Sequence, residues 1–302
     1  MKSYFLPAAV CALFLASCNK KINDTSSANI IFKFKFDSTQ QRLNNIGQPS
    51  VIPAGNAALS PVFNGMSAHY LELAPNALTA LGKGAILFHA AETSVGGSNA
   101  IDFEKCTIVK DGATFISLPL KNIPAGEYEW LRLSLAYQNY DIRFRIDTVL
   151  SGIPINSEFT GTVASFIGFN SYIKSYTLKT DTILVNGNRK QGYWGLESNG
   201  NIAGTPLTLK TSGQAPEGAT TVVNPIFSTS PIPSGSCVVT AAFKPGKLII
   251  TGNETQDIIV ELSLSTNKSF EWKEVINNGK WEPLKGEKVV DMGIRGMIPA
   301  IQ

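Results

Sequence analysis

Apolar and polar residues alternate along several short stretches of the chain. Phe32, Phe34 and Phe36 alternate with two lysines, and the same period of two occurs at 131–135, 142–146, 176–180 and 260–264. Successive side chains of a β-strand point to opposite faces of its sheet. Each stretch therefore predicts a strand with one buried and one polar face, as in an antiparallel sheet.

Two shorter runs, 238–239 and 248–250, are apolar throughout and predict strands buried on both faces. Turn signals such as Lys110-Asp111-Gly112, Asn186-Gly187-Asn188 and Asn278-Gly279 separate these stretches. They recur about every ten to fifteen residues, a spacing typical of β-sandwiches. We expect an all-β fold, an antiparallel β-sandwich of immunoglobulin-like or jelly-roll-like type, with one or two short helices.

Helical signals are few. The segment from Pro75 to Leu81, followed by Gly82, predicts two turns of helix. The segment from Thr160 to Tyr172 is ambiguous, because some of its apolar residues have helical spacing. Residues 196–235 are rich in Gly, Pro, Ser and Thr and predict long loops or short edge strands.

The amino terminus has the architecture of a secretory signal. Lys2 precedes an apolar run at 5–16, which is too short to cross a bilayer. Leu15-Ala16-Ser17-Cys18 resembles the lipobox of bacterial lipoproteins, which implies cleavage before Cys18 and lipid attachment to it. We therefore expect a signal peptide at 1–17, a lipidated tether at 18–29 and a β-sandwich domain, in one unit or two lobes, at 30–302.

The residues after Cys18 bear on localisation. Several acyl chains would anchor the protein stably to a membrane. Asn19, rather than Asp, follows the cysteine, which by resemblance to enterobacterial sorting favours the outer membrane. Residues 20–24 lack the acidic cluster that resembles the surface-export tag of Bacteroidota lipoproteins. We expect a periplasm-facing protein, with the cell surface as the alternative.

The charge balance bears on two kinds of binding surface. The 302 residues include 26 basic and 23 acidic side chains, a net charge of +3. Neither a nucleic-acid surface nor a polybasic membrane patch is indicated. The expected partners are the membrane, through the lipid, and a glycan or an envelope protein.

Cys106 and Cys237 remain once Cys11 leaves with the signal and Cys18 carries lipid. An even pair in an oxidising compartment favours a disulfide. Both lie in strand-like runs, where small buried thiols are also common. A bridge between them and two separate thiols are the two interpretations.

Common catalytic motifs are missing from the sequence. It has no Walker loop, no Gly-x-Ser-x-Gly elbow and no His-Glu-x-x-His pair, so we assign no catalytic residue and expect no cofactor. A glycosidase would need paired carboxylates, and Glu127/Glu129 and Glu271/Glu274 are not distinguished from surface charges. An envelope hydrolase stays an alternative to a non-catalytic protein.

The chain contains two histidines, His69 and His89. We expect structural roles for both and assign no metal site. The alternative is that the fold brings them together with Glu72, Glu92 or Met66 around a metal ion.

Aromatic clusters are the remaining candidates for ligand contact. They lie at apparent strand ends or loops, where exposed rings stack on sugars or line a cleft. Packing in the core is the alternative. The candidates are Tyr137, Tyr140, Tyr193, Trp194, Trp272 and Trp281.

Four short motifs are spread over most of the chain: Phe32-x-Phe34-x-Phe36-Asp37, Ile123-Pro124-Ala125-Gly126-Glu127-Tyr128, Gly192-Tyr193-Trp194-Gly195 and Val290-Asp291-Met292. Together they resemble the MbnP-like β-sandwich proteins of bacterial envelopes. The resemblance implies a periplasmic metal-associated binding protein, and more broadly the chain resembles the lipoproteins of Bacteroidota. Taken together, the sequence favours a lipid-anchored binding or assembly module without catalysis.

Overall fold

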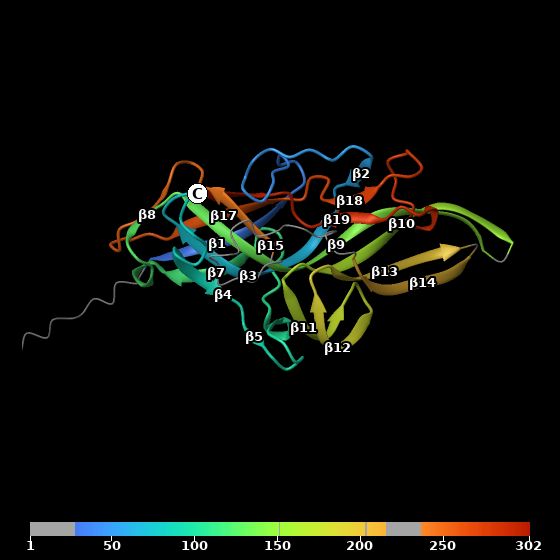
Figure 1. Cartoon of the computed structure of the whole chain (residues 1–302), viewed down its shortest axis with the longest axis horizontal. Coiled ribbons are helices and arrows are strands. Elements are labelled where there is room, and N and C mark those ends of the chain that lie inside the picture. Colours follow the sequence, from blue (N-terminus) through green and yellow to red (C-terminus); the bar gives the residue numbers. More distant parts are fainter. Residues whose placement is uncertain (1–27, 151, 203, 216–236) are drawn as a thin grey trace, which may run out of the picture.

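The computed structural model describes residues 28–150, 152–202, 204–215 and 237–302 (Figure 1). The predictions for the signal peptide, for Cys18 and for tether residues 18–27 concern residues outside these ranges. The first described strand, β1 (Asn29–Asp37), starts one residue before the expected domain boundary.

The described residues form an all-β protein with five sheets. The largest sheet has the strand order β14-β13-β10-β9-β3-β4, with β15 also paired to β9. Its strands are β3 (Val62–Ala74), β4 (Ala85–His89), β9 (Trp130–Leu150), β10 (Ile153–Phe166), β13 (Tyr193–Ile202), β14 (Thr205–Gln214) and β15 (Cys237–Ala242).

The long strand β9 organises this sheet. Along one edge it pairs first with β15 and then with β10, and along the other edge it pairs with β3, all antiparallel. β9 has 21 residues, so one strand connects both ends of the elongated molecule (Figure 1).

A second sheet packs against the largest one. Its order is β20-β17-β1-β7, with β7 (Thr114–Pro119), β17 (Ile258–Ser265) and β20 (Met297–Ile301). Phe32 of β1 and Leu262 of β17 are fully buried in the same core as Leu131 of β9. The alternation at 32–36 and 260–264 thus predicts the buried faces correctly, and the antiparallel β-sandwich is confirmed, although β1 and β17 pair in parallel.

Three small sheets complete the fold. β11 and β12 form a hairpin that projects beside β13 (Figure 1). The small-sheet strands are β2 (Asn56–Leu59), β5 (Glu92–Thr93), β6 (Ala100–Asp102), β8 (Gly126–Tyr128), β11 (Asn170–Thr177), β12 (Thr182–Lys190), β16 (Leu248–Ile250), β18 (Phe270–Lys273) and β19 (Val289–Met292). The strand orders of the three small sheets are β12-β11-β6-β5, β16-β8 and β19-β18-β2.

Helices in the described part of the chain are limited to single 3₁₀ turns. These are η1 (Phe103–Lys105), η2 (Leu120–Asn122) and η4 (Pro283–Lys285). Among the described residues, none of the helical segments could span a bilayer.

The predicted helix at Pro75–Leu81 is wrong, because this segment forms turns between β3 and β4. The ambiguous segment at 160–172 belongs to β10 and β11. Of the residues predicted as loops or short edge strands at 196–235, those at 196–214 mostly form the long β13–β14 hairpin, and those at 216–235 lie outside the described residues. In the last two cases cross-strand pairing, a non-local interaction, overrides the local pattern.

Two further strand faces differ from expectation. Arg132 and Ser134 of β9 are buried rather than exposed, because the turns between β3 and β4 cover that face and Thr79 accepts a hydrogen bond from Arg132. Conversely, Ile249 is exposed between the buried Leu248 and Ile250. Successive side chains of a strand point to opposite faces, so Leu248 and Ile250 face the core and Ile249 faces solvent.

Candidate functional site

His69 occupies an irregular position in β3. Ala68 pairs with Leu135 of β9 and Tyr70 pairs with the adjacent Ser134, so His69 is an extra residue without a counterpart on β9, while its carbonyl oxygen accepts the N–H of Ala90 on the other edge. Such β-bulges redirect a side chain and bend the strand locally. The His69 side chain is fully buried and its ring meets residues of β4 and β5.

His89 and Glu92 complete a cluster around His69. His89 ends β4, and Glu92 follows in β5. Nε2 of His69 lies 2.8 Å from Oε1 of Glu92, and Nε2 of His89 lies 3.6 Å from the same oxygen. One ligand atom from each of the three side chains falls within 4.8 Å of the others.

Neighbouring groups fix the orientation of two of these side chains. Nδ1 of His89 lies 3.1 Å from the carbonyl oxygen of Ala90. A carbonyl only accepts, so in this hydrogen bond Nδ1 carries the proton and Nε2 offers its lone pair to the cluster. Nδ2 of Asn99 donates to Oε2 of Glu92 at 2.7 Å, which leaves Oε1 for the two rings.

The environment favours the protonation states that bind metal. Burial lowers the pKa of His69, although the hydrogen bond to Glu92 acts in the opposite direction. Burial alone would raise the pKa of Glu92, but hydrogen bonds from Asn99 and His69 outweigh it and lower that pKa. Neutral imidazole and ionised carboxylate are the forms that coordinate a metal ion.

The donor set is chemically suited to a transition metal. Two imidazole nitrogens and one carboxylate oxygen are ligands that zinc(II) and copper(II) accept. The three residues differ in access, since His69 is buried whereas the side chains of His89 and Glu92 are 41% and 24% exposed. Phe169 covers the His69 ring from another side, with ring centroids 5.4 Å apart. The cluster therefore opens to solvent on one side.

The chain matches no known protein family, no curated protein and no solved structure. The resemblance to MbnP-like proteins thus depends on the short motifs alone. The functional interpretation below depends on the geometry of this chain.

Of the three residues considered beside the histidines, only Glu92 joins them. Glu72 accepts hydrogen bonds from Tyr70 and from the backbone of Gly82 and Gly84. Met66 is buried in the main core. Glu92 lies three residues after His89, but the sequence gives no local signal that selects it over Glu72.

Cys106 and Cys237 are free thiols, so the structure corresponds to the second of the two interpretations. Cys106 follows η1 and lies 3.7 Å from the carbonyl oxygen of Asp102, whereas Cys237 lies opposite Leu135 in the largest sheet. Burial raises the pKa of Cys106 to about 11 and that of Cys237 to about 12. Both thiols are therefore weak nucleophiles in the folded protein.

Most of the candidate aromatic residues pack in the core instead of on an exposed ligand face. Tyr137 and Tyr193 belong to the core under β11, and Tyr140 and Trp272 to the core under β18. Trp281 packs edge-on against Phe270, with centroids 4.9 Å apart. Trp194 is half-buried and lines, with Trp281, an apolar hollow of about 370 Å³.

The carboxylate pairs that a glycosidase would use are engaged elsewhere. Glu127 and Glu129 both pair with Lys247 on the surface. Glu271 is buried and pairs with Arg42 and Arg295. Glu274 accepts hydrogen bonds from the backbone of Asn278 and Gly279.

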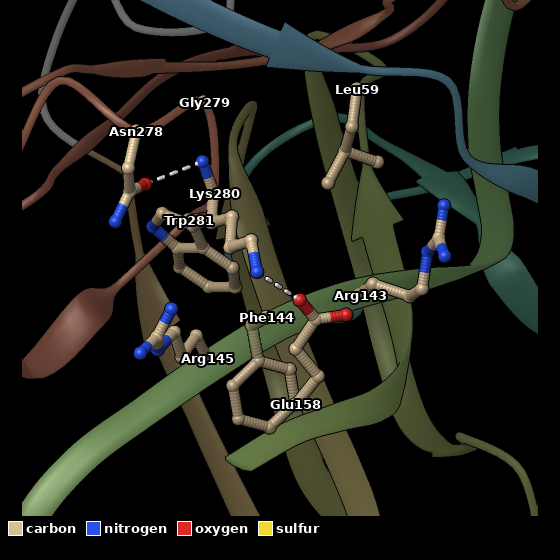
Figure 2. A pocket seen from close by; sticks show the side chains of 9 residues that line it. All are labelled: Leu59, Arg143, Phe144, Arg145, Glu158, Asn278, Gly279, Lys280 and Trp281. Atoms are coloured by element: carbon tan, nitrogen blue, oxygen red, sulfur yellow. Dashed lines mark hydrogen bonds and ion pairs between the residues drawn. The ribbon is translucent and has the colours of Figure 1, made fainter. Parts of the chain in front are cut away.

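A further pocket, which the sequence did not indicate, lies beside the carboxyl-terminal half of β9. Figure 2 shows the side chains that line it. Its volume is about 300 Å³. Arg143 and Arg145 of β9, Glu158 of β10 and Lys280 of the loop after β18 line it together with apolar side chains.

Proposed function

We propose that this protein is a lipid-anchored envelope protein that binds a transition-metal ion, zinc(II) or copper(II), through His69, His89 and Glu92. The convergence of these three side chains within 4.8 Å is the observation that carries the proposal. The function is binding and delivery of the ion, without catalysis.

The arrangement supports this function in three respects. Asn99 and Ala90 orient Glu92 and His89, which reduces the ordering needed on binding. The Glu92 carboxylate offsets part of the ion's charge. The exposed side of His89 gives an incoming ion or a partner protein access to the cluster.

Binding would require one proton to move. Nε2 of His69 donates to Glu92 in the present arrangement, so this proton must shift to Nδ1 of the same ring, which has no hydrogen-bond partner among the described residues, before Nε2 can coordinate. Metal binding should weaken at acid pH, because a protonated imidazole has no lone pair to offer the ion.

Metal content tests the proposal directly. Protein purified without a tag and stripped with a chelator is dialysed against zinc(II) or copper(II), and bound metal is measured by mass spectrometry. We expect one ion per chain. His89→Gln and Glu92→Gln should each weaken binding about 10- to 100-fold or more, because each removes a ligand.

Glu127→Gln is the matched control, since it removes an exposed carboxylate that pairs with Lys247 away from the cluster. It should bind metal as the wild type does. Less than one ion per chain in the wild type, or equal binding by all variants, would contradict the proposal.

The anchoring part has its own test. Cys18→Ser removes the predicted lipid attachment site, so the variant should leave the membrane fraction and lose palmitate labelling. Membrane association that survives the substitution would overturn the anchoring part alone, because the metal measurement does not depend on it.

A further inference from the structure

The pocket in Figure 2 is distinct from the metal cluster, which lies on β3, β4 and β5. Arg143 and Arg145 are two residues apart on β9 and so share one face of the sheet. Glu158 lies directly opposite Arg145 on β10, and Thr160 lies opposite Arg143. Residues 278–281 of the loop after β18 form another part of the pocket wall.

Internal contacts hold that loop in place. The backbone N–H of Arg145 donates to the carbonyl oxygen of Trp281 at 2.8 Å. Oε1 of Glu274 accepts the N–H groups of Asn278 and Gly279 at 2.7 and 2.8 Å. Oε2 of the buried Glu282 accepts from the Asn278 amide at 2.7 Å. The pocket wall is therefore built before any ligand arrives.

These contacts also leave the pocket with an excess of positive charge. Glu274 and Glu282 are occupied by the loop and by Arg145, whose Nε lies 3.5 Å from Oε1 of Glu282. Glu158 is the carboxylate that lines the pocket, and it pairs with Lys280 at 2.6 Å. Arg143 is exposed and makes no ion pair or hydrogen bond with the other described residues.

Glu158 already occupies the position that an anion would take. Its carboxylate lies between the side chains of Lys280 and Arg143 in Figure 2. The hydrogen bond and charge of Lys280, with the charges of Arg143 and Arg145, lower the pKa of Glu158. Because Glu158 is 46% exposed, it is able to move aside at little cost.

The remaining surfaces suit a sugar ring. Phe144, Trp281 and Leu59 give the pocket apolar walls. A second hollow of about 620 Å³ shares Leu59 and Arg143 with it and adds Ser60, Thr160 and Asp141. Hydroxyl and carboxylate groups beside apolar walls are the usual combination for binding a polyhydroxylated ring.

From this arrangement we infer a binding site for an acidic sugar, a uronate unit, whose carboxylate is held by Arg143 and Lys280 in place of Glu158. A guanidinium binds a carboxylate with two parallel hydrogen bonds. The ring lies against Trp281 and Leu59, and its hydroxyls reach toward Ser60 and Thr160.

Titration calorimetry with methyl glucuronide, methyl glucoside and inorganic phosphate tests this site. We expect the glucuronide to bind and the glucoside to bind at least about tenfold more weakly, because the glucoside lacks the charge-assisted hydrogen bonds. Arg143→Ala should weaken glucuronide binding about tenfold for the same reason. Glu158→Gln should strengthen it about two- to fivefold, because it removes the competing carboxylate.

Lys247→Ala is the matched control, since it removes one exposed positive charge at a surface pair with Glu127 and Glu129. It should bind the glucuronide as the wild type does. Melting temperatures of the variants show whether each is folded, and Arg143 and Glu158 are exposed, so both variants should fold.

Three results would overturn the inference. The first is no binding of the glucuronide, or unchanged binding by both pocket variants. The second is equal binding of the glucoside and the glucuronide, which would show that the carboxylate of the sugar does not contribute to binding. The third is equal binding of phosphate, which would make the pocket a general anion site. None of them affects the metal proposal.

Discussion

Nη1 of Arg132 lies 3.8 Å from Oε1 of Glu72, and both side chains are fully buried in the largest sheet. The same carboxylate accepts the N–H groups of Gly82 and Gly84, and Arg132 donates to the carbonyl oxygen of Thr79. This pair therefore holds the turns between β3 and β4 against the sheet.

Glu72→Gln should destabilise the protein strongly. It leaves the Arg132 charge buried without its partner, which typically costs about 3–5 kcal/mol. Urea denaturation followed by circular dichroism measures the free energy of unfolding. Glu127→Gln, which breaks an exposed pair with Lys247, should change it by less than about 1 kcal/mol. Similar losses in the two variants would show that the buried pair contributes little.

Arg132 also shows what periodicity predicts well and what it misses. The alternation of Leu131, Leu133 and Leu135 identifies a strand and its core face, because that face is decided by the residues themselves. Whether the opposite face is buried or exposed depends on which distant segment covers it. Turns at 75–84 bury Arg132, and no local pattern contains that information.

Glu197 of β13 should make the folded protein less stable in acid. It accepts the backbone N–H groups of Lys179, Thr180 and Asp181 at 2.9–3.0 Å and the Thr180 hydroxyl. Burial raises its pKa, but these hydrogen bonds outweigh burial and lower the pKa from 4.5 to about 2. A carboxyl with a depressed pKa in the folded state binds fewer protons there than in the unfolded chain.

The ionised Glu197 should contribute fully to the free energy of unfolding above pH 4.5, and this contribution should be lost as the pH falls towards 2. Glu197→Gln should therefore lower the free energy of unfolding by about 2 kcal/mol at neutral pH, and the difference from the wild type should shrink in acid. Thermal unfolding across this pH range measures both. A difference that stays constant with pH would contradict the role of the ionised carboxylate.

The two internal thiols should be unreactive in the folded protein and free after unfolding. Burial keeps the pKa of Cys106 and Cys237 far above neutral, so iodoacetamide should label neither in the native protein. After unfolding in denaturant without reductant, mass spectrometry should find both alkylated. Labelling that requires a reductant would demonstrate a disulfide instead.

The two candidate sites differ in how far the sequence indicates them. His69 and His89 attract attention because the chain has no other histidines, although their meeting depends on the pairing of β3 with β4 and on the bulge at His69. Arg143, Glu158 and Lys280 come from two strands and a loop, and each resembles an ordinary surface charge in its local sequence. Only tertiary structure distinguishes them.

The parallel pairing of β1 with β17 has a consequence for biogenesis. Ile30 lies opposite Ile258 and Phe34 opposite Leu262, so β1 can pair early with β7, but its second neighbour comes from residues more than two hundred positions later. Contacts between such distant positions form late and slowly. A nascent chain therefore stays without its completed main core until residues 258–265 have been synthesised.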